Sequence, residues 1–160
     1  MMKKLLIIIL FLIPFFSIAQ VTLNVNAIEM DEPVTFTVDI NQANACNGIT
    51  KTVNDEFPKV YMHAGIGNNA NAFGFNVIGN WGIDDGVGEM ISNGDGTYSI
   101  TITPQDYFDL TTVQINTATR IGMVFRNADG TQELKLNNSG SCADFIFPIG
   151  AVQVKLTEPT

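Results

Sequence analysis

The 160-residue sequence is poor in the residues that most enzymes use for catalysis, and this shortage excludes several classes of function. It contains one histidine, His63, and two cysteines, too few for the usual zinc sites. There is no HExxH, no GxSxG, no glycine-rich phosphate loop and no Cys–His nucleophilic pair. Asp84, Asp85 and Glu89 provide the carboxylates that a glycosidase needs, but adjacent aspartates in GIDDGVG are more typical of a solvated turn. We therefore expect no catalytic activity, no metal and no cofactor.

Basic residues are also scarce. Eight Lys and Arg stand against sixteen Asp and Glu, which gives a formal net charge of −8. Such a chain repels nucleic acids and anionic membrane surfaces, so neither is an expected partner. A neutral polysaccharide remains compatible with this charge.

Long hydrophobic runs are confined to the start of the chain. Two lysines precede an apolar run from Leu5 to Phe16, and Ser17 and Ala19 place small residues at positions −3 and −1 of a signal-peptidase site. The run is shorter than the roughly 20 residues that a membrane-spanning helix needs. We expect residues 1–19 to be a signal peptide cleaved before Gln20. The mature chain is then secreted, held at the cell surface or periplasmic, without inserting into the membrane.

Residues 20–160 have the length of one domain, and their pattern predicts β-structure. Val34, Phe36, Val38 and Ile40 alternate with polar residues, as in a strand with one buried face. Similar segments predict strands at 21–25, 59–63, 73–78, 88–91, 97–102, 121–126, 132–136, 144–147 and 152–156. One helical turn is expected at 103–110, with Thr103 as its N-cap and Pro104 at its first position. The prediction is an all-β antiparallel sandwich with one short helical turn.

Several phrases of the sequence point to a family. They are VYMHAGIG (60–67), VIGNWGIDDGVGEM (77–90), NGDGTYSITITPQDYF (93–108) and RIGMVFRNADGTQE (120–133). In this order they resemble the immunoglobulin-like β-sandwich modules of secreted bacterial proteins, including modules that precede α-amylases. The resemblance covers about half of the chain and implies a non-catalytic, carbohydrate-associated module, with starch or another α-glucan as ligand. The alternative is a structural or adhesion protein of the cell surface that binds another protein.

Trp81, in the phrase GNWG, is the best candidate for a ligand platform, because indole faces can stack on the apolar faces of sugar rings. Similar phrases occur in starch-binding modules, where the aromatic residue stacks on glucose. Immunoglobulin-like folds also bury a lone tryptophan in the core, so both placements are open. Asp84, Asp85, Arg126 and Asn127 can offer hydrogen bonds to sugar hydroxyls, although turn formation explains Asn127 equally well.

The two cysteines are Cys46 and Cys142. An even number of cysteines in an exported chain, without CxxC spacing, predicts one disulfide bond. Two free thiols are the alternative. A disulfide between these positions closes a loop of about 100 residues, for which the chain-entropy model gives roughly 4–5 kcal/mol of stabilisation.

Overall fold

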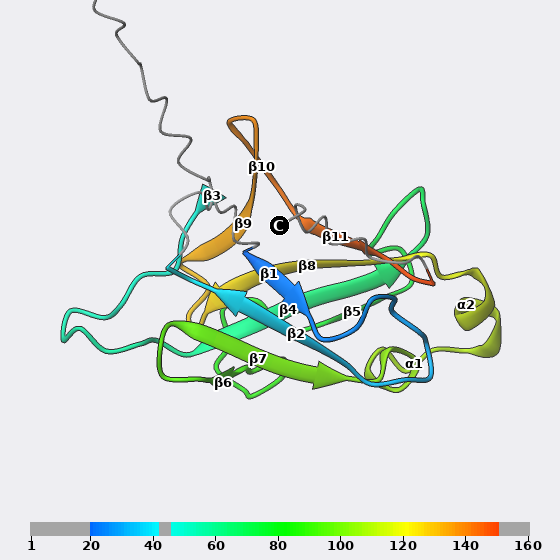
Figure 1. The fold of residues 1–160 in the computed structure, drawn as a ribbon, viewed down its shortest axis with the longest axis horizontal. Helices are drawn as coiled ribbons and strands as arrows, with labels where there is room; N and C mark the ends of the chain where they lie inside the picture. The colour runs from blue at the N-terminus through cyan, green and yellow to red at the C-terminus, as the bar shows by residue number, and fades with distance from the viewer. Residues whose placement is uncertain (1–19, 42–45, 151–160) are drawn as a thin grey trace, which may run out of the picture.

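The computed structural model describes residues 20–41 and 46–150, which form two antiparallel β-sheets packed face to face (Figure 1). The four-stranded sheet has the order β1-β2-β7-β6, and its strands are β1 (Val21–Leu23), β2 (Val34–Asp39), β7 (Thr97–Ile102) and β6 (Ile91–Ser92). The seven-stranded sheet has the order β10-β9-β8-β4-β5, with β11 paired to β8 and β3 paired to β9. Its strands are β3 (Cys46–Asn47), β4 (Val60–Gly67), β5 (Asn76–Ile78), β8 (Arg120–Asn127), β9 (Glu133–Asn138), β10 (Ser141–Ala143) and β11 (Phe145–Pro148). The predicted all-β antiparallel sandwich is confirmed.

Most of the strands occur where the alternation of apolar residues predicts them. The predicted strand at 152–156 and the predicted signal peptide at 1–19 lie outside the described residues. Strands β3 and β10 were not predicted, because their sequences, CN and SCA, show no alternation of apolar residues; both pair with β9. Strand β4 continues past the predicted end at 63 to Gly67.

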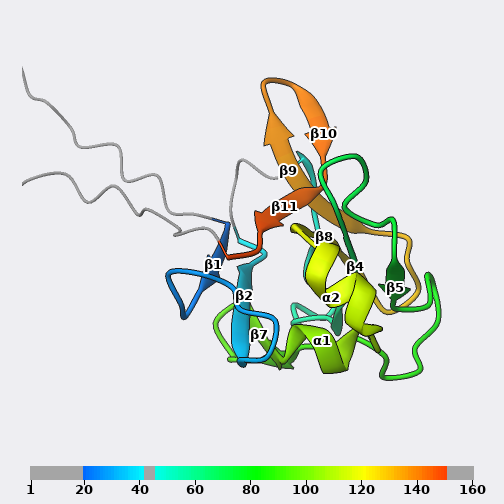
Figure 2. The same ribbon diagram turned by 90° about the vertical axis from the view of Figure 1, so that its right-hand side faces the viewer.

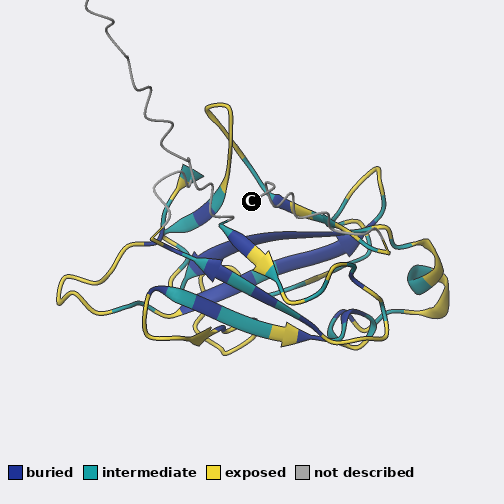
Figure 3. Ribbon diagram, in the orientation of Figure 1, coloured by how far each residue is buried: buried dark blue, intermediate teal, exposed yellow. Residues whose placement is uncertain are grey.

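The core lies between the two sheets, where the inward faces of the strands are buried (Figure 3). Phe36 and Val38 of β2 are fully buried there, as are Met62 of β4 and Met123 and Phe125 of β8. Because successive side chains of a strand alternate, the neighbours of these residues on β4 and β8 belong to the opposite face of the seven-stranded sheet. We call this the outer face. On β4 and β8 it carries the cross-strand pairs Tyr61–Arg126, His63–Val124 and Gly65–Gly122.

Two short helices, α1 (Pro104–Tyr107) and α2 (Thr112–Thr117), lie at one end of the sandwich (Figures 1 and 2). Helix α1 occupies the predicted turn with Pro104 at its start, although the Thr103 side chain makes no capping hydrogen bond. The prediction of a single helical turn was incomplete. Helix α2 begins with a capping box in which Thr111 and Gln114 bind each other's backbone N–H, and the T-x-x-Q spacing is its sequence signal.

Cys46 and Cys142 form a disulfide bond, as predicted, and their Cα atoms are 5.3 Å apart. The bond connects β3 to β10, and both strands pair with β9. In Figure 1 the β9–β10 hairpin projects from the body of the sandwich. Among the described residues, no helix is long and apolar enough to cross a membrane.

Candidate functional site

Residues 79–90 connect β5 to β6 and fold over part of the outer face; we call them the Trp81 loop. The backbone holds the end of this loop, because Met62 N–H donates to the Gly88 carbonyl at 2.8 Å and Met90 N–H donates to the Val60 carbonyl at 2.9 Å. Gly88 has a φ of +81°, and a Cβ added there would lie 2.3 Å from the Met62 carbonyl oxygen. A side chain at this position therefore cannot be accommodated without displacing the loop.

The Arg126 side chain holds the middle of the Trp81 loop by hydrogen bonds to its backbone. Its Nη2 donates to the carbonyls of Asn80 at 2.6 Å and Ile83 at 3.0 Å. Its Nη1 donates to the carbonyls of Asn127 and Ala128, both at 2.9 Å. Arg126 is fully buried, so the guanidinium joins the Trp81 loop to the turn between β8 and β9. This placement differs from the prediction that Arg126 offers hydrogen bonds to a ligand, because its charged end is enclosed by backbone carbonyls.

Tyr61 is the second support of the Trp81 loop. Its ring packs against the guanidinium of Arg126, whose Cζ lies 4.4 Å from the ring centroid. The buried hydroxyl contacts the carboxylates of both Asp84 and Glu89, the latter at 3.0 Å. Lys59 Nζ donates to Asp84 at 2.9 Å and lies 3.7 Å from Glu89. Asp84, a predicted ligand contact, therefore also fixes the loop.

The pKa values in this cluster reflect these contacts. Hydrogen bonds from Tyr61 and then from Lys59 lower the pKa of Asp84 below its ordinary value. The lowered pKa means that the contribution of Asp84 to stability is present above its ordinary pKa and is lost as the pH falls through the lowered value. Burial, followed by hydrogen bonds to the two carboxylates, raises the pKa of Tyr61 to about 12.

Trp81 lies on the outside of this fixed loop and is 46% exposed. Its ring stands edge-to-face against His63, with centroids 5.4 Å apart and an interplanar angle of 86°. The indole Nε1 lies 2.9 Å from the position that a Cβ on Gly130 would occupy, so the ring borders the β8–β9 turn. Of the two placements that the sequence leaves open, the structure has Trp81 at the surface and outside the core.

An open groove of about 430 Å³ lies beside Trp81. It is lined by Asn47, Gly48, Trp81, Gly130, Thr131, Gln132 and Glu133. Its polar side chains are held in place. Asn47 Nδ2 donates to Glu133 at 2.9 Å, and the Gln132 amide makes two hydrogen bonds with Thr50, at 2.9 and 3.0 Å. The groove therefore combines one exposed aromatic ring with oriented amide, hydroxyl and carboxylate groups, as hydroxyl-rich ligands require.

The other predicted ligand contacts organise turns. Asp85 accepts hydrogen bonds from Asn80 Nδ2 at 2.6 Å and from the Val87 N–H at 3.0 Å, and the first of these is the main cause of its lowered pKa. Asn127 accepts from the Gln132 N–H at 3.1 Å and donates to Thr131. Asn127 thus performs the turn function that its sequence context suggests.

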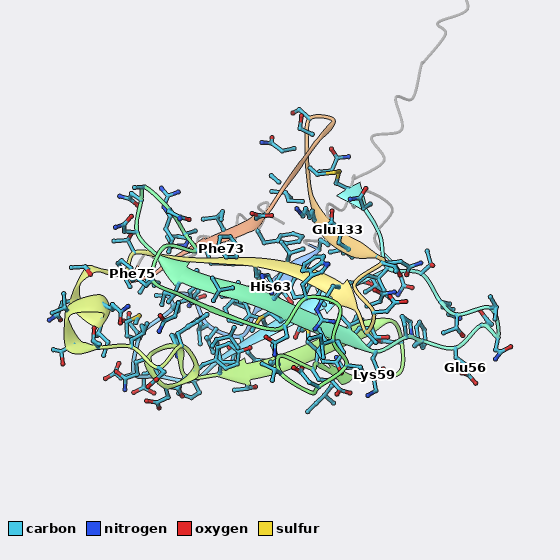
Figure 4. All side chains as sticks on the ribbon, turned by 180° about the vertical axis from the view of Figure 1, so that it is seen from behind. Glu56, Lys59, His63, Phe73, Phe75 and Glu133 are labelled. Carbon is cyan, nitrogen blue, oxygen red and sulfur yellow. A yellow bond between two sulfur atoms is a disulfide. The ribbon has the colours of Figure 1, made fainter. Side chains whose placement is uncertain are left out.

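Four residues of the site were not identified from the sequence. They are His63, Asn47, Gln132 and Glu133. Pairing on the sheet brings Glu133 next to Arg126, and Asn47 reaches the groove through the pairing of β3 with β9. His63 lies on the outer face, where its Nδ1 is 2.9 Å from the Gly79 carbonyl (Figure 4). In the part of the chain that the structure describes, no group of three or more His, Cys, Asp and Glu side chains can hold a metal ion.

A second groove, of about 450 Å³, is lined by Phe57, Pro58, Lys59, Glu89, Met90, Ile91, Ser92 and Tyr98. Its tyrosine is 1% exposed and donates its hydroxyl to the Pro58 carbonyl at 2.6 Å. Tyr98 therefore cannot serve as a stacking platform there. The other aromatic residue of this groove, Phe57, already has Lys51 Nζ 4.6 Å from its ring centroid, so the groove beside Trp81 is the better candidate.

The pKa values of the three tyrosines provide a test of their burial. The chain has three, and burial raises the pKa of all of them, to about 12 for Tyr61 and Tyr107. We expect the near-ultraviolet phenolate absorbance of the folded protein to stay low as the pH passes 10 and to rise only on further alkalinisation. A raised pKa adds stability that is present below the unfolded value near 10 and is lost as the pH approaches 12, so unfolding should accompany the rise. The urea-unfolded chain, titrating near 10, is the control, and a folded protein titrating there too contradicts the prediction.

No protein-family model matches the chain, and the search of curated proteins finds no match. The resemblance to modules of secreted bacterial proteins therefore stays a prediction.

Proposed function

We propose that this protein is a secreted, non-catalytic module that binds a neutral polysaccharide through Trp81. The observation that carries the proposal is the position of this indole, half exposed on a loop that Arg126 and Tyr61 fix from below. The groove beside it supplies Asn47, Gln132 and Glu133 for sugar hydroxyls. The apolar faces of sugar rings stack on such a ring, and fixed polar groups at its edge give orientation. An α-glucan such as starch is the proposed ligand on the strength of the sequence resemblance.

A second candidate is a cell-surface protein that binds another protein, and a group of exposed apolar side chains favours it. Val77, Ile83, Val87 and Ile91 are 40–75% exposed and lie close in sequence to Trp81. The edge strands β1, β5 and β6 have only two or three residues, so they offer little backbone for strand addition. These side chains therefore offer a protein partner more than those three edges do. The polar groove beside Trp81 favours the polysaccharide.

The test is the variant Trp81→Ala. We expect it to abolish retention of the mature protein on insoluble α-glucan, with a loss of unfolding free energy well below the roughly 3–5 kcal/mol of a core Trp→Ala change. Retention in a pull-down and the thermal unfolding midpoint are the measurements.

Ile83→Ala is the matched control, because Ile83 is 54% exposed on the same loop and its hydrogen bond to Arg126 uses only the backbone carbonyl. This variant should bind the glucan normally. A Trp81→Ala protein that is retained like the wild type refutes the proposed platform. Wild-type protein that binds no glucan leaves the protein-binding alternative ahead.

A further inference from the structure

The outer face carries a second aromatic ring, which lies on a pair of glycines. Gly65 of β4 is paired with Gly122 of β8. A Cβ added to either glycine would lie 2.4 Å from a ring carbon of Phe73, at Cδ1 and Cε2 respectively. The ring therefore lies directly on the backbone of both strands, in a space that exists because both residues lack a side chain.

The surroundings of Phe73 are partly open. Its side chain is only partly buried, and its neighbours in the same row of the sheet are Val77, opposite Gly65, and Ile146, opposite Gly122. Val77 is 45% exposed and Ile146 is 42% exposed. Asn71, from the same segment as Phe73, is also exposed, and its Oδ1 accepts a hydrogen bond from the Phe73 N–H at 2.9 Å.

His63 occupies the outer-face row between Phe73 and Trp81. The pair His63–Val124 is the next outer-face row after Gly65–Gly122, and two residues along a strand span about 7 Å. The His63 ring in turn contacts Trp81. Figure 4 shows His63 between Phe73 and Glu133. The three rings thus form a strip along the outer face that is longer than a single sugar ring.

Two cations beside the strip are held by polar neighbours. Arg120, opposite Gly67 in the next outer-face row, donates its Nε to Asn69 Oδ1 at 2.9 Å. Lys135 of β9 lies 3.7 Å from Glu133 and 3.5 Å from Asp144, so it is ion-paired with two carboxylates. Arg126 is buried beneath the Trp81 loop. The strip therefore presents flat apolar surface beside polar groups that already have partners, which suits an uncharged, hydroxyl-rich chain.

We infer that Phe73 is a second stacking position for the ligand, so that the protein recognises a linear chain of several sugar units lying along the outer face from Trp81 to Phe73. This inference rests on the proposed function and extends it. It predicts an affinity that increases with the length of the ligand until both rings are covered.

The experiment measures the dissociation constants of linear α-1,4-glucose oligomers of increasing length by calorimetry. The wild type should bind longer oligomers more tightly. Phe73→Leu keeps an apolar side chain over the two glycines but removes the flat ring. It should bind the shortest oligomer like the wild type and the longest about tenfold more weakly, a change of about 1.4 kcal/mol. Val113→Ala, which changes an exposed residue of α2, is the control and should behave as the wild type.

The outcomes separate this inference from the proposed function. Wild-type protein that binds no oligomer overturns both. A wild type whose affinity increases with length, together with a Phe73→Leu variant that shows the same increase, overturns the second stacking position alone. Equal weakening at all lengths in Phe73→Leu also overturns it, because a change confined to the far end of the strip must spare the shortest ligand.

Discussion

The variant Arg126→Met is expected to be less stable than the wild type by at least about 3 kcal/mol, because hydrogen bonds to a charged group contribute roughly 1.5–3 kcal/mol each and buried carbonyls left unpaired are costly. Four carbonyls, of Asn80, Ile83, Asn127 and Ala128, accept from the guanidinium, and Met supplies no donor. Urea denaturation followed by circular dichroism measures the difference. An unchanged unfolding midpoint contradicts the prediction.

The same variant also tests whether Arg126 positions Trp81 beyond its effect on stability. Leu134→Ala is the matched control, since Leu134 is fully buried on β9 and its truncation costs about 2–5 kcal/mol. At a temperature where both variants are folded, Leu134→Ala should bind glucan like the wild type, whereas Arg126→Met should bind more weakly. Arg126→Lys should fall between the wild type and Arg126→Met, because a single ammonium cannot span four carbonyls in two segments. Equal binding by Arg126→Met and Leu134→Ala limits Arg126 to a stabilising role.

The strands could be predicted because the alternation of apolar and polar residues is a local property of the sequence. Val34 to Ile40 is an example, and β2 has the expected burial. The end of β4 could not be predicted in this way, because the outer-face positions Gly65 and Gly67 have no side chains to show a period. Gly65 lies beneath the ring of Phe73 from the following segment, and Gly67 lies against the backbone of Asn71 and Gly74.

The position of Trp81 could not be derived from its neighbours in sequence. It depends on His63 and Gly130, which the sheet and the β8–β9 turn bring to the indole. The burial of Arg126 also could not be derived from its neighbours in sequence. A charged residue beside a turn suggests exposure, but the Trp81 loop covers it and its cross-strand neighbour Tyr61. The sequence pattern therefore predicts the loop, whereas long-range packing decides which of its residues are exposed.

Removal of the disulfide bond is the other change with a large expected effect. A Cys46→Ser/Cys142→Ser variant should lose about 4–5 kcal/mol of unfolding free energy, as the chain-entropy model gives for a loop of this length. The bond joins residues 96 positions apart, so the loop includes β4 to β9 and constrains most of the unfolded chain. A loss of this size is a large share of the 5–15 kcal/mol that is typical of a whole domain.

Denaturation with and without a reductant measures this contribution. The reductant should lower the unfolding midpoint of the wild type to that of the double variant and leave the double variant unchanged. Because the loss arises mainly in the unfolded chain, the folded double variant should keep the tryptophan fluorescence of the wild type in the absence of denaturant. Asn47 makes this comparison informative for the site. Asn47 follows Cys46 directly, and its Nδ2 holds Glu133 in the groove beside Trp81. A changed fluorescence of the folded double variant would show that the disulfide bond also orders this groove. That result contradicts an effect confined to the unfolded chain.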